Sequence, residues 1–279
     1  MSDVDHLIRT FNRFELKYVL DEAQVDAIRH ALLAYMSADD HGSSGGHYLV
    51  TSLYYDSPDR RCYWEKEAGV RVRRKLRIRH YEPAEALTEE TPVFVEIKQR
   101  VDRVTQKRRT VLPYRDALRL CNDRQIPDHA PEDAAVIEEI YAFLWQYNLR
   151  PAVIVRYERQ AFMGGRFDPG LRVTLDRMLS FQTRPLRLHE ITYAWPMLPA
   201  HQVIMEIKAN ERIPHWLTEL IAAFNLTATR ISKYCRAMEV GGLLLDAACL
   251  PAERSEEALS TCLSSFSRLR ARMGMGAGM

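Results

Sequence analysis

The stretch VRVRRKLRIRHY, residues 70–81, decides the fold class. Side chains of a β-strand alternate between its two faces, and one face of this segment would be entirely basic. Its members are Arg71, Arg73, Lys75, Arg77 and Arg79. The positions between them are mainly apolar and are interrupted only by Arg74. This alternation predicts a β-strand with one charged face and one apolar face.

Seven more segments alternate with the same period and are predicted strands. They are Arg13–Leu20, Tyr48–Asp56, Val93–Gln99, Thr105–Leu112, Ala152–Phe162, Leu171–Leu179 and Val203–Ala209. Helical periodicity predicts helices at Asp21–Met36, Ala134–Tyr147, Pro214–Phe224 and Lys233–Leu245. Asp21, with Gln24 three positions later, fits a capping box at the first helix. Mainly sequential strands with few helices predict an α+β fold, an eight-stranded antiparallel β-barrel closed on itself with helices packed outside.

The pattern Glu-x-Lys recurs on three of these strands. The pairs are Glu15 with Lys17, Glu96 with Lys98, and Glu206 with Lys208. A charged face on a single strand is usually just solvated, but repetition favours a barrel whose lumen is charged. Buried charge must be paired or must meet a ligand, and Lys and Arg are in excess here. The predicted ligand is therefore a polyanion rich in phosphate, and the glutamates could hold Mg²⁺ or Mn²⁺ beside it.

Further polar side chains share these strand faces. They are Tyr157 with Arg159, Lys107 with Arg109, and Arg172 with Thr174 and Asp176. Before the last predicted helix stand Arg230, Ser232 and Lys233. Ser232 could cap that helix, and the helix N-terminus with its two flanking cations would then form an anion site. A plain capping role for Ser232 is equally compatible with the spacing.

The composition limits the alternatives. The chain has 279 residues and a net charge of only +2, so its overall charge does not indicate a nucleic-acid-binding protein. Its cysteines are scattered, its first residues are polar, and no apolar run approaches the roughly 20 residues of a membrane span. These features predict a cytoplasmic protein with reduced thiols. Phosphate-loop, HExxH and GxSxG motifs are absent from the sequence.

The ordered set of motifs resembles the VTC domain, the catalytic domain of polyphosphate polymerases in the triphosphate tunnel metalloenzyme (CYTH-like) superfamily. The matching segments are RFELKY at residues 13–18, SLYYD at 52–56, KLRIRHY at 75–81, VEIK at 95–98, RYERQAF at 156–162, RVTLD at 172–176, MEIK at 205–208 and SKY at 232–234. The resemblance covers roughly residues 10–245. We therefore expect a VTC-type tunnel domain at residues 8–248 and a partly disordered tail at residues 249–279.

The resemblance implies an eight-stranded tunnel that transfers the γ-phosphoryl group of ATP to a growing polyphosphate chain. The catalytic residues it implies are Lys17, Arg77, Arg79, Lys98, Arg159 and Lys233. The substrate-binding residues it implies are Arg13, Lys75, Lys107, Arg109, Tyr157, Arg172, Lys208, Arg230 and Ser232. The implied metal ligand for Mn²⁺ or Mg²⁺ is Glu206, with Glu15 and Glu96 as further candidates. Replacing Arg77 or Arg79 by alanine is expected to weaken phosphate binding and to leave stability unchanged or raised, because crowded like charges repel.

One departure bears on the reaction. Tunnel triphosphatases usually open with Glu-x-Glu-x-Lys, whereas Arg13 stands at the first glutamate position of this chain. Losing a carboxylate and gaining a cation favours retention of an anionic chain over hydrolysis. A triphosphatase and a non-catalytic module that binds polyphosphate or nucleotide remain the alternatives. Nucleic acid is not an expected partner, because the basic faces lack an aromatic stacking pattern. A separately encoded membrane partner could hold the protein at the inner face of a membrane.

Overall fold

The computed structural model describes residues 13–40, 45–81, 87–102, 104–190, 194–210 and 212–244. The strands in these residues are β1 (Arg13–Asp21), β2 (Met36–Ala38), β3 (His47–Asp56), β4 (Val72–His80), β5 (Pro92–Val101), β6 (Val104–Pro113), β7 (Arg150–Gly164), β8 (Arg172–Gln182), β9 (Trp195–Pro196) and β10 (Gln202–Asn210). The helices are α2 (Glu22–Leu33), α3 (Arg61–Glu67), α4 (Tyr114–Asp123), the 3₁₀-helix η2 (Pro131–Asp133), α5 (Ala134–Gln146), α6 (His215–Ala223) and α7 (Lys233–Val240). All eight predicted strands and all four predicted helices are confirmed.

The strands form one antiparallel sheet in the order β1-β10-β8-β7-β3-β4-β5-β6. The two short strands that the sequence did not predict lie off this path, β2 beside β7 and β9 beside β8. The α+β class is therefore confirmed. The closed barrel is not, because within the described ranges no ladder of hydrogen bonds joins the end strands β1 and β6.

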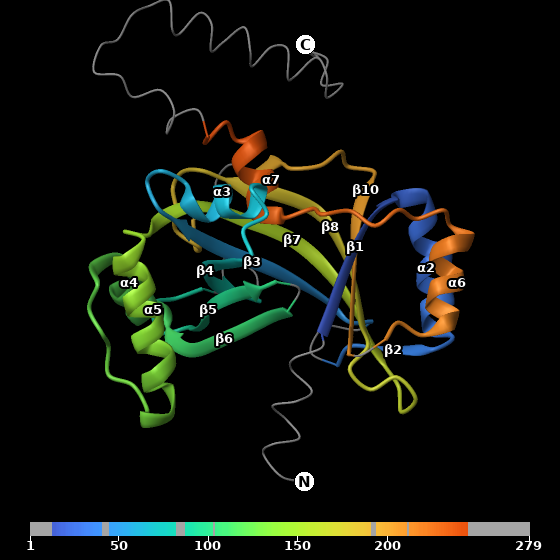
Figure 1. The fold of residues 1–279 in the computed structure, drawn as a ribbon, viewed down its shortest axis with the longest axis horizontal. Coiled ribbons are helices and arrows are strands. Elements are labelled where there is room, and N and C mark those ends of the chain that lie inside the picture. The colour runs from blue at the N-terminus through green and yellow to red at the C-terminus, as the bar shows by residue number, and fades with distance from the viewer. Residues whose placement is uncertain are drawn as a thin grey trace, which may run out of the picture. The chain divides into compact units, whose positions relative to one another are not determined.

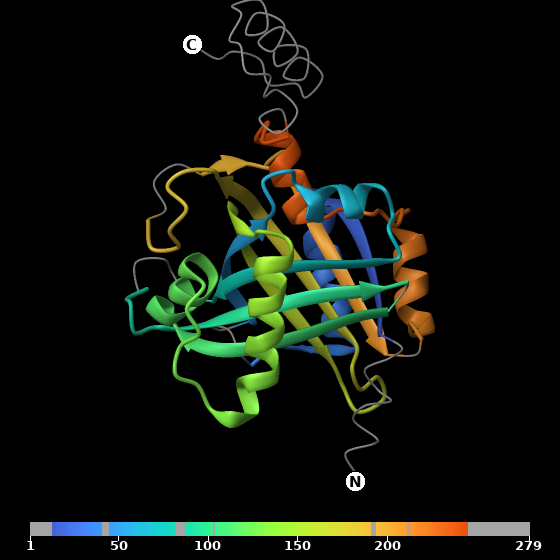
Figure 2. The ribbon, with the colours of Figure 1, turned by 60° about the vertical axis from the view of Figure 1, so that its left-hand side comes forward.

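The sheet is strongly curled, although it is open. Figures 1 and 2 show β4, β5 and β6 running across the direction of β1 and β10. An ion pair joins Lys98 of β5 to Glu15 of β1, with 2.8 Å between Nζ and Oε2. These strands lie far apart in the sheet order, so one face of the sheet curls over and brings its own side chains together. We call this concave, charged side the inner face.

The apolar side of each strand packs under helices on the outer face, as the alternation predicts. One core joins Leu76 and Val95 of the sheet to Leu120 of α4 and Phe143 of α5, and all four side chains are fully buried. A second core packs α2 and α6 on β1, β8 and β10, and it contains residues such as Leu32. In Figure 1 the two helix pairs lie on opposite sides of the sheet's concave region. The capping box predicted at Asp21 is present at the start of α2.

The carboxylate of Asp56 ties the end of β3 to two helices. This fully buried group accepts hydrogen bonds from the backbone N–H of Cys62 at 2.8 Å and of Tyr63 at 3.1 Å, both in α3. It also accepts one from the hydroxyl of Tyr234 in α7. Because Tyr234 follows Lys233 directly, this contact fixes where α7 presents Lys233 to the inner face. None of the helices in the described part of the chain is both long and apolar enough to cross a membrane.

We expect Asp56→Ala to lower the free energy of unfolding by at least about 3 kcal/mol, since two backbone amides and a hydroxyl lose a buried, charged acceptor. Urea unfolding followed by tryptophan fluorescence measures the change. Asp59→Ala is the matched control, because Asp59 is exposed only three residues later. Equal stabilities for the two variants would show that Asp56 does not hold α3 and α7 in place.

Candidate functional site

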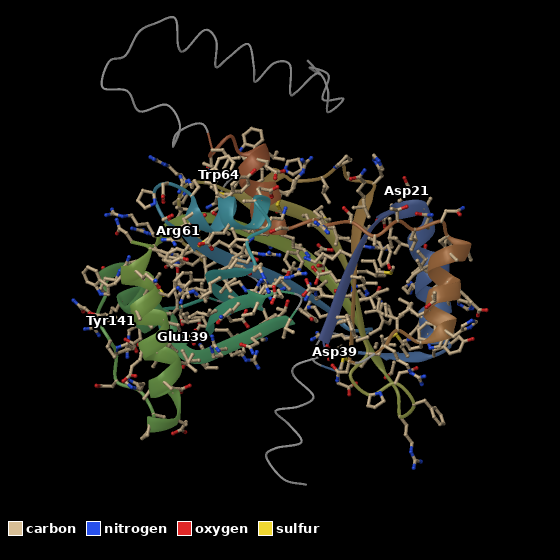
Figure 3. All side chains as sticks on the ribbon, in the orientation of Figure 1. Asp21, Asp39, Arg61, Trp64, Glu139 and Tyr141 are labelled. Carbon is tan, nitrogen blue, oxygen red and sulfur yellow. The ribbon has the colours of Figure 1, made fainter. Side chains whose placement is uncertain are left out.

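The inner face gathers charged side chains from β1, β4, β5, β6, β7, β8, β10 and α7. They are Glu15, Lys17, Lys75, Arg77, Arg79, Glu96, Lys98, Lys107, Arg109, Arg159, Arg172, Asp176, Glu206, Lys208 and Lys233. The cations clearly outnumber the carboxylates. In Figure 3 nitrogen and oxygen atoms crowd the region where β4–β6 face β1. The faces predicted from strand alternation thus converge on one region.

Asp176 of β8 and Glu206 of β10 anchor the most buried cations. Asp176 binds the Arg159 guanidinium through two hydrogen bonds of 2.6 and 2.8 Å. Lys233 Nζ bridges the two carboxylates, at 2.5 Å from Asp176 Oδ2 and 2.7 Å from Glu206 Oε1. Lys208 Nζ lies 3.5 Å from the other oxygen of Glu206. Each of these two carboxylates therefore holds more than one cation in a fixed position.

Glu15 and Lys17 extend this cluster along β1. Lys17 Nζ lies 3.2 Å from Glu15 Oε1 and 3.5 Å from Glu206 Oε1, and it donates to the carbonyl of Ile231 at 3.1 Å. Glu15 also binds Lys98, as described above. Lys17 therefore joins β1 to β10 and to the segment that leads into α7.

A second cluster surrounds Glu96 of β5, which is fully buried. Arg77 reaches Glu96 Oε2 through Nε at 2.8 Å and Nη2 at 2.6 Å, and it donates to the Tyr54 hydroxyl at 3.1 Å. Lys107 Nζ lies 3.3 Å from Glu96 Oε1. Arg109 lies over the ring of Phe94, 4.5 Å from its centroid, and is exposed.

Two more arginines of the inner face are held by neutral or mixed groups. Arg79 donates to Ser52 Oγ at 2.9 Å and to the Tyr157 hydroxyl at 3.3 Å. Arg172 donates to the Tyr48 hydroxyl at 2.7 Å and to Asp39 at 2.8 Å. Asp39 is labelled in Figure 3. Arg79 is buried without a carboxylate partner among the described residues, which leaves its charge for a ligand.

The start of α7 reaches the inner face as the sequence predicts. Ser232 is its N-cap, and the Ser232 hydroxyl accepts the backbone N–H of Cys235. Lys75 of β4 donates to that same hydroxyl at 3.1 Å and lies 3.3 Å from Cys235 Sγ. The capping role of Ser232 is confirmed, and the N-terminus of α7 also lies beside a lysine of the sheet.

The pKa shifts of the inner-face lysines differ in direction. Burial lowers the pKa of Lys208 to about 7, although the Glu206 and Glu15 carboxylates oppose the shift. Burial also lowers the pKa of Lys98 and that of Lys107. In contrast, Asp176 and Glu206 overcome the effect of burial at Lys233 and raise its pKa. A bound polyanion would supply the missing negative charge and raise the lowered values.

Most residues that the resemblance implied therefore lie on the inner face, but two differ. The side chain of Arg13 lies outside the described residues, and Arg230 is exposed just before α7. Arg71, expected on the charged face, precedes β4 and pairs with the exposed Asp102 at 2.6 Å. Strand alternation had placed Asp176 beside Arg172 without indicating that Asp176 holds Arg159 and Lys233.

The structure argues against the expectation that loss of Arg77 leaves stability unchanged or raised. Arg77 is the closest cation to the fully buried Glu96. Among the described residues, removing Arg77 would leave that carboxylate with one ion pair, to Lys107, whose side chain is 45% exposed. An uncompensated buried charge costs more than the like-charge repulsion that its removal relieves.

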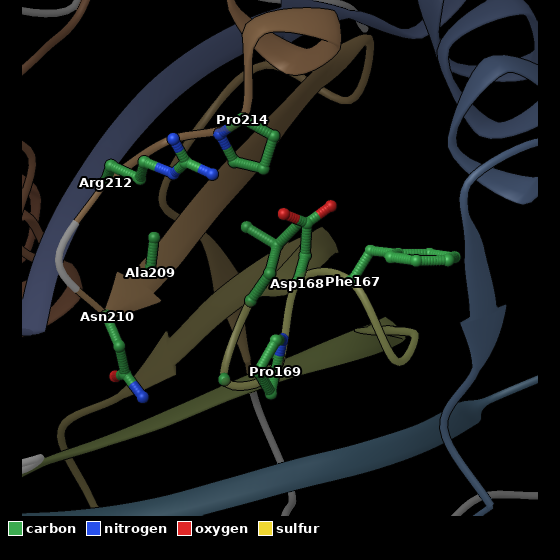
Figure 4. A pocket seen from close by; sticks show the side chains of 9 residues that line it. Phe167, Asp168, Pro169, Ala209, Asn210, Arg212 and Pro214 are labelled. Carbon is green, nitrogen blue, oxygen red and sulfur yellow. The ribbon is translucent and has the colours of Figure 1, made fainter.

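One open pocket lies away from this region. A pocket of about 360 Å³ is lined by residues 167–171, 209–210, 212 and 214, at the ends of β8 and β10 (Figure 4). Phe167 points away from its centre in that view. The pocket contains none of the predicted site residues, so it is not the candidate site.

The predicted metal ligand Glu206 is surrounded by cations. Across the described segments, no three His, Cys, Asp or Glu side chains are arranged to hold a metal ion. The two oxygens of Glu206 contact Lys17, Lys233, Lys208 and Arg159. With these cations around it, Glu206 could hold a metal ion only together with phosphate oxygens, since Mg²⁺ commonly uses one protein carboxylate with substrate phosphates.

Comparisons with known proteins agree with the sequence pattern. Residues 12–241 match the VTC domain family. A Bacillus halodurans protein provisionally named an adenylate cyclase superposes with a TM-score of 0.45 at 13% identity, covering 79% of this chain and 95% of its own. The PH1819 protein of Pyrococcus horikoshii OT3 gives a TM-score of 0.41 at 12% identity, with coverages of 81% and 98%. Neither structure bears on function at this level of similarity, and no curated protein matches the sequence.

We expect Tyr54 to ionise early. Burial alone would raise its pKa, but the guanidinium groups of Arg77 and Arg79 lower it to about 8. Tyrosinate absorbance should therefore show a step near pH 8 that Tyr54→Phe removes. The control Tyr147→Phe should keep the step, because the pKa of Tyr147 is raised. The pKa of Tyr54 is lower in the folded protein than in the unfolded chain. The ionised Tyr54 should therefore add to the free energy of unfolding above about pH 10, and this contribution should be lost as the pH falls from about 10 to about 8.

We expect Arg77→Ala to reduce the free energy of unfolding by about 3–5 kcal/mol, because it leaves the Glu96 carboxylate buried and underpaired. Arg109→Ala should change stability by less than about 1 kcal/mol, since Arg109 is exposed and contacts a ring rather than a carboxylate. Chemical denaturation at neutral pH compares the two variants. If Arg77→Ala were as stable as Arg109→Ala, the expectation from the sequence, that loss of Arg77 leaves stability unchanged or raised, would hold after all.

Proposed function

The chain belongs to the VTC domain family, and from this membership we propose that it is a polyphosphate polymerase. Its reaction would transfer the γ-phosphoryl group of ATP to the end of a polyphosphate chain lying along the inner face. ADP would be the leaving product. The curled sheet, covered by helices outside and lined by cations inside, would act as the tunnel.

The observation that carries this proposal is the unbalanced positive charge of the inner face. Arg79 is buried and forms no ion pair with the residues that the structure describes, and burial lowers the pKa of Lys98, Lys107 and Lys208. Two buried polar atoms, Arg172 Nε and Thr174 Oγ1, also have no hydrogen-bond partner within the described ranges. Phosphate oxygens would accept from the Arg172 and Thr174 groups and would neutralise the lysines, which is what a site built for linked phosphates requires.

The residues of this chain would act mainly by positioning and by neutralising charge. An oxygen of the terminal phosphate of the chain attacks the γ-phosphorus, and the bond from that phosphorus to the bridging oxygen of ADP breaks. Asp176 holds Arg159 and Lys233 in place, so these cations need not reorganise as negative charge shifts to the leaving oxygen. Arg77 and Arg79, which share the inner face of β4, would bind oxygens of neighbouring phosphates.

A divalent metal ion, Mn²⁺ or Mg²⁺, would be held by Glu206. Bound at this carboxylate, the metal would supply positive charge beside the phosphates. Glu15 remains a further candidate, and both of its oxygens, like those of Glu206, lie close to lysine ammonium groups.

Arg13 favours the polymerase over a triphosphatase. It stands at the start of β1 where tunnel triphosphatases have a glutamate, opposite Asn210 of β10. A cation at that position would add to the attraction for a long anionic product. A triphosphatase would release the phosphate instead.

We expect Glu206→Gln to abolish ADP release and polymer formation when the purified protein is incubated with ATP and Mn²⁺. The wild type should release ADP and produce a ladder of phosphate polymer on a gel. The amide keeps the size of the side chain but removes the charge that holds Lys17, Lys208 and Lys233. Glu158→Gln is the matched control, because Glu158 is exposed on β7 and should leave the reaction intact.

The products decide among the candidate functions. Inorganic phosphate without polymer would make the protein a triphosphatase. Binding of tripolyphosphate with neither product would make it a binding module. Full activity in Glu206→Gln would remove Glu206 from the site.

A further inference from the structure

The register of β4 and β5 places like charges directly opposite one another. Lys75 lies opposite Lys98, and Arg73 lies opposite Arg100 two residues further toward the strand ends. The next strand continues the first of these rungs, because Lys107 of β6 lies opposite Lys98. Like charges directly opposite on neighbouring strands destabilise a sheet. The repulsion between these like charges lowers the stability of the sheet, and an anion bound between them would offset that repulsion.

The two rungs differ in how their charges are held. Lys98 and Lys107 each contact a carboxylate, Glu15 and Glu96 respectively. Arg73 and Arg100 instead donate to backbone carbonyls, Arg73 to Val70 at 2.8 Å and Arg100 to Asp102 at 2.9 Å. Within the part of the chain that the structure describes, neither arginine forms an ion pair. The Arg73–Arg100 rung therefore carries charge that no carboxylate of these segments compensates.

A third arginine faces the same place from another element. Burial lowers the pKa of Arg73, and the charges of Arg100 and Arg230 lower it further. Arg230 belongs to the segment before α7, which lies beside β4 because Lys75 donates to the hydroxyl of Ser232 at 3.1 Å. Arg230 is exposed and forms no hydrogen bond or ion pair with the described residues. β4, β5 and the segment before α7 together bring three uncompensated arginines to one end of the inner face.

The spacing along β4 separates this cluster from the central site. Arg79 and Arg73 are six residues apart, which is about 20 Å along an extended strand. Three linked phosphates at Arg77 and Arg79 would not reach that far. At the opposite end of the inner face, Tyr81 and Phe94 are in edge-to-face contact at 5.4 Å, and Arg109 lies over the Phe94 ring. Toward the start of β4, by contrast, two arginines without an ion pair among the described residues, Arg73 and Arg100, face each other on neighbouring strands.

We propose that Arg73, Arg100 and Arg230 form a second anion subsite, which binds the part of a polyphosphate chain that extends beyond the phosphates at the central site. The proposal rests on the proposed function, because it takes the ligand to be a phosphate chain. It adds that the chain leaves the central site toward this end of β4 and β5. The subsite selects for length, since a triphosphate bound centrally does not touch it.

The test compares two probes on the full chain without nucleotide, inorganic tripolyphosphate and long-chain polyphosphate. The variants are the double substitution Arg73→Gln with Arg100→Gln, and Arg230→Gln alone. Arg29→Gln with Arg119→Gln is the charge-matched control, because these arginines lie exposed on α2 and α4 of the outer face. Titration calorimetry at several salt concentrations gives the affinities and their salt dependence.

We expect the double variant to bind long-chain polyphosphate at least about tenfold more weakly than the control, with tripolyphosphate affinity unchanged. The slope of log affinity against log salt concentration should fall by about one to two, roughly one per arginine removed. Arg230→Gln should show about half of that change in slope.

Each other result overturns a defined part of the argument. Unchanged long-chain affinity in the double variant would refute the subsite and leave the proposed function standing. An equal loss for both probes would place Arg73 and Arg100 in the central site and refute a separate subsite. A wild type that binds neither probe would refute the proposed function, and the subsite with it.

Discussion

The structure depends on one constraint. A concave sheet face rich in Lys and Arg is largely buried, yet its carboxylates must leave part of this positive charge uncompensated for a ligand to bind. Moving charge out of water costs several kcal/mol per group unless a partner compensates it. The fully buried Asp176 and Glu96 provide part of that compensation through short, well-aligned contacts with arginine. The two apolar cores outside the sheet supply the stability that the inner face lacks, since helices bury the opposite side of the same strands.

The carboxylates of the inner face hold the cations in fixed positions, but they neutralise only part of the positive charge. Arg159 has two hydrogen bonds to one carboxylate, and Lys233 bridges two carboxylates from different strands. A cation fixed in this way does not have to be ordered when a ligand binds, so it contributes more to affinity and to catalysis. The Asp56–Tyr234 contact extends the same logic to the helix that carries Lys233. The arginines at the end of β4 and β5 lack such anchors, which suits a region that follows a flexible chain.

Strand alternation predicted the fold well because it records which side chains share a face. It placed every strand of the main sheet path and most charged residues of the site. It could not predict closure, because whether β1 and β6 pair depends on curvature and register and not on the pattern within one strand. The helix α4 was not predicted, although its buried residues at 114, 117, 120 and 121 have helical spacing. The pairing of Asp176 with Lys233 joins residues far apart in the chain, and no local pattern contains it.

The same ion pairs bear on the choice of nucleophile. Burial alone would raise the pKa of each inner-face carboxylate, but the neighbouring cations lower the pKa of Glu15, Glu96, Asp176 and Glu206 instead. A carboxylate with a lowered pKa is a poor general base, because proton transfer to it from water is unfavourable. Hydrolysis by carboxylate-activated water would therefore work against the electrostatics of this site. The terminal phosphate of a polyanion needs no such base, since it is already largely deprotonated near neutral pH, and the cations that weaken the carboxylates as bases are the groups that would hold it in line.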